Sequence, residues 1–566
     1  MDVTRRDMLG MASAAGMAVA SEPLLAAAQT GVRGGLPAGP WAEVARRLTD
    51  FARADLADKG FPGMTIAFAG PGGVQASFGV GLADLARRKP VAPDQLFQIG
   101  SITKSLTVMA LFVLADRGKL DLDARVQDLL PEHPLPPEPI TLTHLIDHSS
   151  GLPNLLEDPA MVDLPGGRLW TGFTPGSRYS YCNLGYALLG SVIERVSGMS
   201  YPLALETLVL KPIGMKQAVP VFRTPDRARY AAGHIRLRED MPWFPRTPLT
   251  EARWFEFSHA AGSVAATGPD MIAYLRYLAG VAKGKGGPLF SDKLAERYRT
   301  PTIDSSPPGA RYGNGLHTLD VDGRPCFRHT GGIHGFSSAF TLDRESGFGC
   351  YASVNVGGAG GYRPVEITEY ALPLLRAVAA NQPLPAVRTP QPRPAIKDGA
   401  RIAGQYRSAD GTAFTIVERG GALAIIANGR TAAIGAAGPD SFVTDHPALA
   451  PYTLALEEGG ARIRLGGRLF GRGQAPAAQP PSARLAPLVA DYYNPASWGG
   501  RPQVFAVGDR LFLGTAELVE ASDGSWRFKE PAMAMERFWF TNRIDGRPQV
   551  LIMSGSRYGR FKDRNL

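Results

Sequence analysis

Ser101 and Lys104 have the residue types and the spacing of an activated nucleophile. They open a stretch, residues 102–115, whose apolar periodicity predicts a helix, so a separation of three residues places hydroxyl and ammonium on one helical face. A serine at a helix N-terminus also gains from the positive end of the helix dipole, which stabilises negative charge on its oxygen. A neighbouring lysine eases removal of the hydroxyl proton. The pair predicts nucleophilic catalysis, but Ser-x-x-Lys alone is common by chance.

Tyr181 and Asn183 supply groups that such a nucleophile needs, about 80 residues further along the chain. A phenol held beside two cations is driven towards phenolate, and it then serves as a general base. The Asn183 amide is placed to donate to a substrate carbonyl. This second motif therefore supports the assignment of the first.

A third motif, His-Thr-Gly-Gly at residues 329–332, precedes a predicted hairpin that begins at Ser337. This placement predicts a strand edge along the pocket, with backbone N–H groups available to an oxyanion. In this order and at these intervals, the three motifs resemble those of the penicillin-recognising serine hydrolases. The most similar subgroup holds class C β-lactamases, D-aminopeptidases, DD-carboxypeptidases and related esterases. Further matching signatures lie at residues 145–152, 212–215 and 265–270.

The resemblance implies a role for each motif residue. Ser101 is the acylated nucleophile, Lys104 its activator and Tyr181 the proton shuttle. The residues that the resemblance places against the substrate are Asn183, His329, Thr330, Gly331 and Gly332. The backbone N–H groups of Ser101 and Gly332 form the oxyanion hole. Acyl transfer then proceeds in two steps through an acyl-enzyme, and neither a metal nor an organic cofactor is implied.

Two positions depart from the class C pattern. His329 stands where those β-lactamases carry a lysine, and histidine is a weaker, pH-dependent anchor for a carboxylate. The peptidase and esterase branches tend to show histidine there. Cys182 replaces the usual serine or alanine, and a spacer packed behind the site is favoured over a second nucleophile. His144 and His148 are four residues apart, and a structural role is favoured over a metal site.

The elements that position these motifs indicate an α+β domain. Residues 64–68 and 74–80 flank a glycine-rich turn and predict a hairpin, as do residues 337–342 and 348–354. Residues 365–380 predict a closing helix. Strands at both ends with helices between them indicate one antiparallel sheet made from both termini. The expected fold is a β-lactamase-like serine hydrolase domain, with helices flanking that sheet.

Two proline-rich segments, residues 381–394 and 474–487, divide the chain into a hydrolase domain at 40–382 and units at 398–474 and 485–566. Each tail unit is rich in short strands and turns, which predicts two small antiparallel β-barrels. The two units look alike, since Tyr406 precedes Leu423 by 17 residues and Tyr493 precedes Leu511 by 18. Chance similarity between two β-rich segments remains the alternative. The arrangement resembles that of D-aminopeptidases.

Composition excludes several classes. The chain of 566 residues is 44% hydrophobic, which rules out wholesale disorder, and no apolar run is long enough to span a bilayer. The net charge of +9 is spread along the chain, so we expect no nucleic-acid partner. Three cysteines cannot form a disulfide framework. Residues 1–28 contain Arg5 and Arg6 before a small apolar stretch and resemble a twin-arginine export signal, which predicts a periplasmic protein.

The leading hypothesis is an exported serine peptidase that cleaves amide bonds of short peptides, with a D-aminopeptidase-like activity. A carboxylesterase or β-lactamase-like hydrolase is the alternative, and a non-catalytic sensor of peptidoglycan fragments is a more distant one. The expected partners are small peptides, amides or esters, and the oligomeric state stays open. A free substrate amino group needs a carboxylate in the cleft, for which the loop at residues 517–523 is a candidate.

Overall fold

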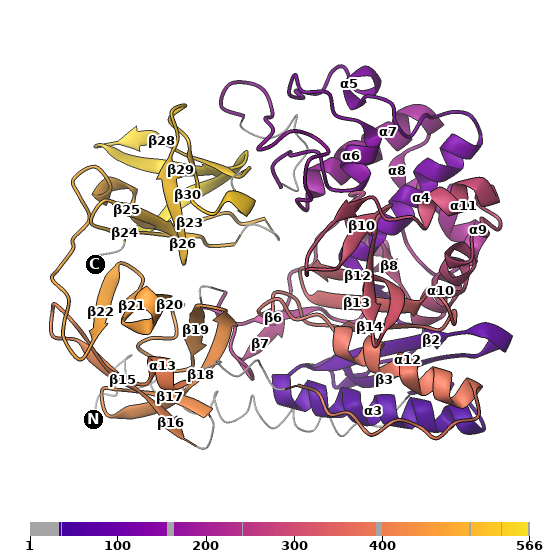
Figure 1. Ribbon diagram of the computed structural model, residues 1–566, viewed down its shortest axis with the longest axis horizontal. Helices are drawn as coiled ribbons and strands as arrows, with labels where there is room; N and C mark the ends of the chain where they lie inside the picture. Colours follow the sequence, from indigo (N-terminus) through magenta and orange to yellow (C-terminus); the bar gives the residue numbers. More distant parts are fainter. Residues whose placement is uncertain are drawn as a thin grey trace, which may run out of the picture.

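The computed structural model describes residues 33–35, 37–154, 164–239, 241–391, 399–419, 422–496, 500–533 and 535–563. A large domain extends to residue 391, and two closed barrels follow at 404–472 and 490–563 (Figure 1). The predicted α+β domain followed by two antiparallel barrels is therefore confirmed. The segment that resembles an export signal lies outside the described residues.

The large domain is built on a 10-stranded antiparallel sheet, ordered β1-β3-β2-β14-β13-β12-β11-β10-β9, with β4 paired to β3. Its strands are β1 (Arg33–Gly35), β2 (Gly63–Ala69), β3 (Gln75–Asp84), β4 (Lys89–Pro90), β9 (Ile303–Asp304), β10 (Arg311–Gly313), β11 (Leu316–Val321), β12 (Arg324–Ile333), β13 (Phe336–Asp343) and β14 (Gly349–Val354). The pairing of β2 with β14 joins the two ends of the domain, as the sequence predicts.

Both predicted hairpins of the large domain are confirmed. Strands β2 and β3 pair with Ile66 opposite Phe78, and the turn between them uses Gly72 and Gly73, whose φ angles of 68° and 80° suit glycine. Strands β13 and β14 pair with Ala339 opposite Ala352.

Helices cover both faces of this sheet (Figure 1). The α-helices described in the large domain are α3 (Pro40–Lys59), α4 (Thr103–Asp116), α5 (Val126–Leu129), α6 (Leu142–Ile146), α7 (Asn183–Ser197), α8 (Tyr201–Leu205), α9 (Lys211–Ile213), α10 (Gly268–Ala282), α11 (Asp292–Tyr298) and α12 (Val365–Ala379). Two short sheets pair β5 (Phe97–Gln98) with β8 (Ala265–Ala266), and β6 (His234–Arg236) with β7 (Leu249–Glu251). The predicted helices at 102–115 and 365–380 correspond to α4 and α12.

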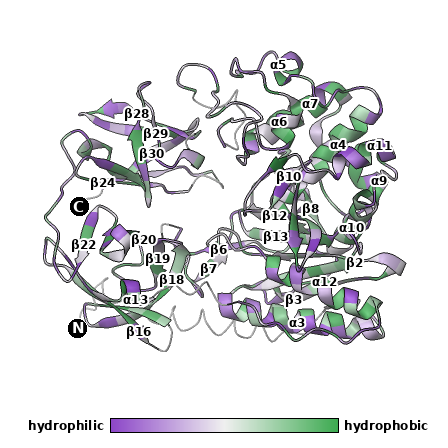
Figure 2. Cartoon of the chain, viewed as in Figure 1, coloured by the Kyte–Doolittle hydropathy of each residue, from purple (hydrophilic) through white to green (hydrophobic). Residues whose placement is uncertain are grey.

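The sheet separates two apolar cores because successive side chains of a strand point to opposite faces. In β2, Ile66 and Phe68 pack with α3 and α12, whereas Ala67 and Ala69 belong to the larger core with α4, α7 and α10. Figure 2 shows the central strands and α4 as predominantly hydrophobic. Helix α4 is buried on nearly every side, since each of its residues from Thr103 to Leu114 is buried. It therefore forms a rigid base for the residues at its N-terminus.

Each barrel closes through eight antiparallel strands. The first barrel, preceded by α13 (Gly399–Ile402), contains β15 (Gly404–Ser408), β16 (Ala413–Arg419), β17 (Ala422–Ala427), β18 (Arg430–Gly438), β19 (Ser441–Thr444), β20 (Leu454–Glu457), β21 (Arg462–Leu465) and β22 (Arg468–Arg472). The second contains β23 (Ala490–Tyr493), β24 (Gln503–Val507), β25 (Arg510–Leu513), β26 (Ala516–Glu520), β27 (Trp526–Phe528), β28 (Arg537–Ile544), β29 (Arg547–Met553) and β30 (Ser556–Asp563).

Each barrel has a buried tyrosine in its first strand that makes the same hydrogen bond, but the predicted equivalence of Tyr406 with Tyr493 is wrong. Tyr406 is buried, and its hydroxyl donates to the carbonyl of Ile402, four residues earlier. Tyr492 makes the same contact with Leu488. The counterpart of Tyr406 is therefore Tyr492 and not Tyr493, since neighbouring strand residues point to opposite faces. In each barrel the tyrosine ties the first strand to the segment before it.

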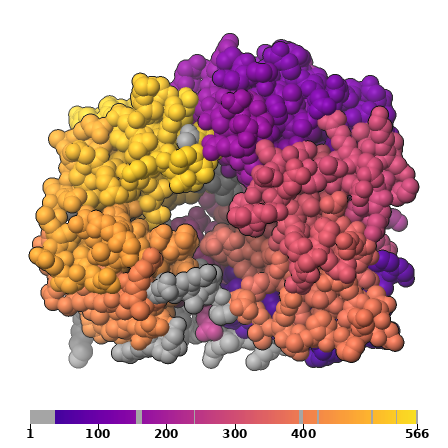
Figure 3. Space-filling view, in the orientation of Figure 1, coloured from indigo at the N-terminus to yellow at the C-terminus, as the bar shows by residue number. Residues whose placement is uncertain are grey.

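The second barrel packs against the large domain, as the space-filling view shows where yellow meets purple (Figure 3). The Trp170 indole N–H donates to the carbonyl of Met535 at 2.7 Å, and its ring packs against Trp539 with centroids 5.3 Å apart. The barrels also share an apolar cluster that includes Leu469 and Phe505. The second barrel thus contacts both the large domain and the first barrel.

No helix in the described ranges is long and apolar enough to cross a membrane.

Candidate active site

The structure brings Ser101 and Lys104 into contact. Ser101 lies in the 3-10 turn Gly100–Ile102, which leads directly into α4, and Lys104 occupies the first turn of that helix. Lys104 Nζ lies 3.2 Å from Ser101 Oγ. The lysine side chain is fully buried, whereas Ser101 is partly exposed and lines a cavity. The Ser101 hydroxyl is therefore accessible while the neighbouring Lys104 amine is shielded from water.

Two oxygens besides that of Ser101 surround the Lys104 amine. It donates to Asn183 Oδ1 at 2.7 Å and to the carbonyl of Ala261 at 2.9 Å. It also lies over the Tyr181 ring, 4.7 Å from the centroid. None of these partners is a carboxylate, and burial lowers the pKa of Lys104 well below its usual value. The site thus favours the neutral amine, which is the basic form.

Tyr181 faces the same group, but its charge differs from the sequence expectation. Burial raises the pKa of this phenol, against the opposing effects of its hydrogen bond with Ser101 and of the Arg363 guanidinium. The expected phenolate is therefore not the resting form, because the cost of desolvating it exceeds the help from nearby donors. The structure instead pairs a neutral phenol, a proton donor, with an amine of lowered pKa.

Strand β12 contains the whole His-Thr-Gly-Gly motif. Its pairing with β11 ends at Arg328, so residues 329–333 pair only with β13 and leave their other edge towards the Ser101 turn. A Cβ atom at Gly100 would lie 2.8 Å from the Gly332 nitrogen, so only glycine permits this close approach. Gly331 is equally confined, since its Cβ would lie 1.9 Å from the Ile99 carbonyl oxygen. The predicted strand edge is present, and the motif residues 329–332 themselves form it.

His329 lies behind this strand edge. Its side chain is only 2% exposed, its Nδ1 lies 2.7 Å from the Thr330 carbonyl oxygen, and its Nε2 lies 3.3 Å from the Tyr312 hydroxyl. Burial lowers the pKa of His329 well below its usual value, so the imidazole is neutral. A neutral, buried ring offers a substrate carboxylate little attraction. The substrate-binding roles of His329 and Thr330 stay predictions.

His148 forms the wall behind Tyr181. The two rings have centroids 4.3 Å apart, and His148 Nδ1 accepts the backbone N–H of Cys182 at 3.0 Å. The Cys182 thiol is buried, donates to the Pro153 carbonyl and accepts from the Gly185 N–H at the start of α7. Burial raises the pKa of Cys182 to about 12, which leaves it an unreactive thiol. In the described part of the chain, no group of three or more potential ligands is placed to hold a metal ion.

Ser101 opens into a cavity of about 590 Å³, a size suited to a small organic ligand. Sequence reasoning identifies Ser101, Asn183 and Gly332 among its lining residues but misses most of the others. These include Arg236, Glu239, Trp243, Phe257, Arg363 and, from the second barrel, Arg501. A Cβ atom at Gly332 would lie 2.1 Å from the Arg363 guanidinium, so Arg363 crosses directly over this glycine. No sequence motif identifies these residues, because they come from the end of β6 and from loops that only the fold brings together.

The loop proposed from the sequence to supply a carboxylate does not do so. Glu517 forms ion pairs with Arg510 and Lys529 within the second barrel, at 3.1 and 3.2 Å. Among the described residues that line the Ser101 cavity, the side-chain carboxylate is instead that of Glu239.

Comparison with known proteins identifies relatives for the large domain. The chain is 30% identical over 172 residues to penicillin-binding protein 4* of Bacillus subtilis, covering 27% of this chain and 38% of that protein. It is 28% identical over 291 residues to the D-aminopeptidase of Gluconobacter oxydans, covering 49% and 52%. The matches thus span about half or less of these relatives.

Among solved structures, the octameric penicillin-binding protein homologue from Pyrococcus abyssi superimposes with a TM-score of 0.54 at 24% identity, over 75% of this chain and 99% of that one. This similarity supports the fold. A family model described as Beta-lactamase matches residues 48–397, more than half of the chain. Together with the Ser101 site, this match shows that the chain belongs to the beta-lactamase family.

Proposed function

We propose that this protein is a serine hydrolase that forms an acyl-enzyme on Ser101 and cleaves amide bonds of short peptides. The observation that carries the proposal is the set of three oxygens around Lys104 Nζ. A neutral amine has two hydrogens and one lone pair. The shorter contacts, to Asn183 Oδ1 and the Ala261 carbonyl, use the two hydrogens. The lone pair then points to Ser101 Oγ, 3.2 Å away, and takes its proton during attack.

The attack forms a bond from Ser101 Oγ to the substrate carbonyl carbon and moves the carbonyl electron pair onto its oxygen. The backbone N–H groups of Ser101 and Gly332 are our candidates for binding this oxyanion, since Gly332 is exposed and the two segments touch at Gly100. When the tetrahedral species collapses, the carbon–nitrogen bond breaks and the neutral Tyr181 phenol gives its proton to the leaving nitrogen. Lys104, protonated in the first step, then restores that proton. Water releases the acyl group by the reverse sequence.

An aminopeptidase activity on D-amino acid residues is supported by the relatives named D-aminopeptidase and by Glu239 in the cavity lining. A carboxylate at this position offers an ion pair to the substrate ammonium. Arg363 favours a second candidate, hydrolysis of amides that carry a carboxylate near the scissile bond, as β-lactams do. Burial lowers the pKa of Arg363, but the group stays charged, so it can hold such a carboxylate through two parallel hydrogen bonds.

The experiment compares turnover of the p-nitroanilides of D-alanine and L-alanine, of p-nitrophenyl acetate and of a chromogenic cephalosporin. We expect D-alanine p-nitroanilide to give the highest kcat/KM, and Glu239→Gln to reduce it about tenfold or more while sparing the ester. The control is Glu256→Gln, which changes an exposed carboxylate outside the described lining of this cavity. Turnover of the ester alone would overturn the peptidase proposal, and turnover of the cephalosporin alone would establish the second candidate.

We also propose that residues 1–28 direct the protein to the periplasm, on the strength of Arg5 and Arg6 before the small apolar stretch. Replacing both arginines by lysine should abolish export, measured by fractionation of expressing cells. Equal export of the variant would exclude this route.

A further inference from the structure

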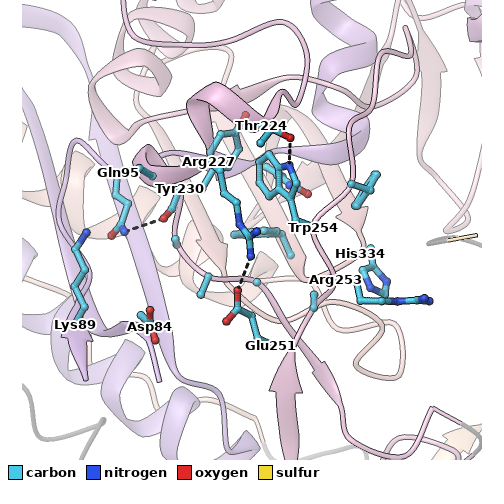
Figure 4. A pocket seen from close by; sticks show the side chains of 18 of the residues that line it. Asp84, Lys89, Gln95, Thr224, Arg227, Tyr230, Glu251, Arg253, Trp254 and His334 are labelled. Carbon is cyan, nitrogen blue, oxygen red and sulfur yellow. Dashed lines mark hydrogen bonds and ion pairs between the residues drawn. The ribbon is translucent and has the colours of Figure 1, made fainter. Parts of the chain in front are cut away.

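A second cavity, of about 620 Å³, lies beside the Ser101 cavity (Figure 4). The two share a wall, because Phe255 and His334 line both of them. The second cavity lies between the end of β3, the strand β4 and residues 224–233 and 251–255. No residue of the three sequence motifs lines it. The second cavity is therefore adjacent to the Ser101 cavity, with Phe255 and His334 between the two.

Gln98 and Tyr230 line this cavity and are only 3% and 6% exposed. Neither Gln98 Oε1 nor the Tyr230 hydroxyl has a hydrogen-bond partner among the described residues. An unsatisfied buried polar atom destabilises a fold by about 1–3 kcal/mol, and a bound water or ligand that supplies the missing partner removes this cost. The Gln98 carbonyl oxygen accepts an N–H, whereas the tyrosine hydroxyl donates to a carbonyl. The pair is thus complementary to an amide group.

The charges around the cavity are unequal. Its two carboxylates are already paired, Asp84 with Arg87 at 2.6 Å and Glu251 with Arg227 at 3.3 Å. Lys89 and Arg253 also line the cavity, and no described carboxylate forms an ion pair with either of them. Arg253 donates to the Pro495 carbonyl of the second barrel, which leaves its charge uncompensated. The excess of two positive charges favours an anionic ligand.

An aromatic wall completes the cavity and is held in place. The Trp254 indole N–H lies 3.3 Å from Thr224 Oγ1, and its ring packs edge-on against Tyr230 with centroids 5.0 Å apart. Figure 4 shows Arg227 between Trp254 and Glu251. A fixed aromatic wall that includes the Tyr230 ring suits a peptide backbone with small side chains.

We propose that this cavity binds the leaving-group side of a peptide substrate that ends in a free carboxylate. Gln98 accepts a peptide N–H, Tyr230 donates to a peptide carbonyl, and Lys89 and Arg253 hold the terminal carboxylate. This inference rests on the proposed peptidase function and narrows it from simple amides to short peptides of defined length.

The test uses D-alanyl-oligoglycines with one to four glycines, each with a free carboxylate or as the terminal carboxamide. We expect kcat/KM to favour the carboxylate form by about tenfold or more at one length, and Lys89→Gln with Arg253→Gln to remove this preference. The matched control is Arg88→Gln, since Arg88 is exposed beside Lys89 but lies outside the described lining. Equal rates for the two forms at every length, or loss of the preference in Arg88→Gln, would overturn the proposal.

Tyr230→Phe removes only the unpartnered hydroxyl, so the fold should keep its Tm while KM for the preferred peptide rises about three- to tenfold. An unchanged KM would contradict the role of Tyr230. Calorimetric titration of the Ser101→Ala protein with tetraglycine separates this inference from the proposed function. One outcome is that tetraglycine binds, the double variant Lys89→Gln with Arg253→Gln abolishes this binding, and the wild type cleaves no peptide. That outcome would support the binding role of the cavity and reject the peptidase function. Peptide turnover without tetraglycine binding would reject the cavity alone.

Discussion

The backbone N–H of Asn154 in the large domain donates to Glu536 Oε1 of the second barrel at 2.9 Å. Asn154 Oδ1 in turn accepts the backbone and side-chain N–H groups of Asn183, at 2.9 and 3.0 Å. Asn183 Oδ1 then accepts from Lys104, the neighbour of Ser101. A continuous series of hydrogen bonds therefore joins the second barrel to Ser101. It orients the Asn183 amide so that its oxygen faces the lysine.

Glu536 should accordingly act as a positioning residue. We expect Glu536→Ala to lower kcat about tenfold and to shift the pH midpoint of kcat/KM, because a reoriented Asn183 changes the pKa of Lys104. Glu536→Gln keeps the acceptor oxygen and should restore both values. Glu520→Ala, which removes an exposed carboxylate of the same barrel and its ion pair with Arg484, is the control. A loss of Tm without a change in the pH profile would show a purely structural role.

Tyr181→Phe should slow amides more than esters. In the proposed mechanism the phenol protonates the leaving nitrogen, whereas p-nitrophenolate leaves without a proton. We therefore expect kcat to fall about 100-fold or more for an anilide and much less for p-nitrophenyl acetate. The matched variant is Tyr186→Phe, because Lys104 also lies over this ring, 5.2 Å from its centroid, and the Tyr186 hydroxyl donates to the Ile146 carbonyl. Equal losses on both substrate types in Tyr181→Phe would argue against proton donation.

Cys182 should prove structural. Its raised pKa and burial predict that iodoacetamide leaves it unmodified in the native protein and modifies it after unfolding, as mass spectrometry would show. Because the thiol accepts the Gly185 N–H at the start of α7, Cys182→Ala should lower the free energy of unfolding by about 1 kcal/mol, whereas Cys182→Ser retains the cap. Loss of acylation in Cys182→Ser, with Tm preserved, would instead assign the thiol a chemical role.

Asp147 makes the fold less stable at neutral pH. Burial raises the pKa of its carboxyl from 3.8 to about 6, so the folded state binds its proton more tightly than the unfolded state does. The contribution of Asp147 to the free energy of unfolding is fully present below about pH 4 and is lost as the pH rises through 6. The loss is about 3 kcal/mol at most. Asp147→Asn keeps an acceptor for the Asn314 N–H, so it should raise the free energy of unfolding at pH 7.5 and leave it unchanged at pH 4.

Asp343→Asn is the opposite control for that measurement. The pKa of Asp343 is lowered despite its burial, since backbone N–H groups and Arg376 bind its carboxylate. The variant should be destabilised at neutral pH, and the difference should vanish in acid. A gain in stability for Asp147→Asn at pH 4, or none at pH 7.5, would contradict the assignment.

The sequence predicts those features that depend on neighbouring residues. Periodicity and turn residues identify the β2–β3 and β13–β14 hairpins and helix α4, and the Ser-x-x-Lys spacing correctly places Lys104 beside Ser101. The sequence predicts charge states less well, because the pKa of Tyr181 depends on desolvation by residues distant in the chain. Tyr492 and not Tyr493 is the counterpart of Tyr406 because successive residues of a strand point to opposite faces. Which of the two tyrosines points inward depends on the register of the barrel strands. Arg363 and Arg501 reach the cavity from loops, and no local pattern marks them.

The central claim is that Ser101 carries the acyl group and that Lys104 removes its proton. The direct measurement is intact-protein and peptide mass spectrometry after incubation with a serine-directed fluorophosphonate, at several pH values. We expect one adduct, on the peptide that contains Ser101, with none in Ser101→Ala and labelling at least 100-fold slower in Lys104→Met. An adduct on another residue, or equal labelling rates in wild type and Lys104→Met, would contradict this account.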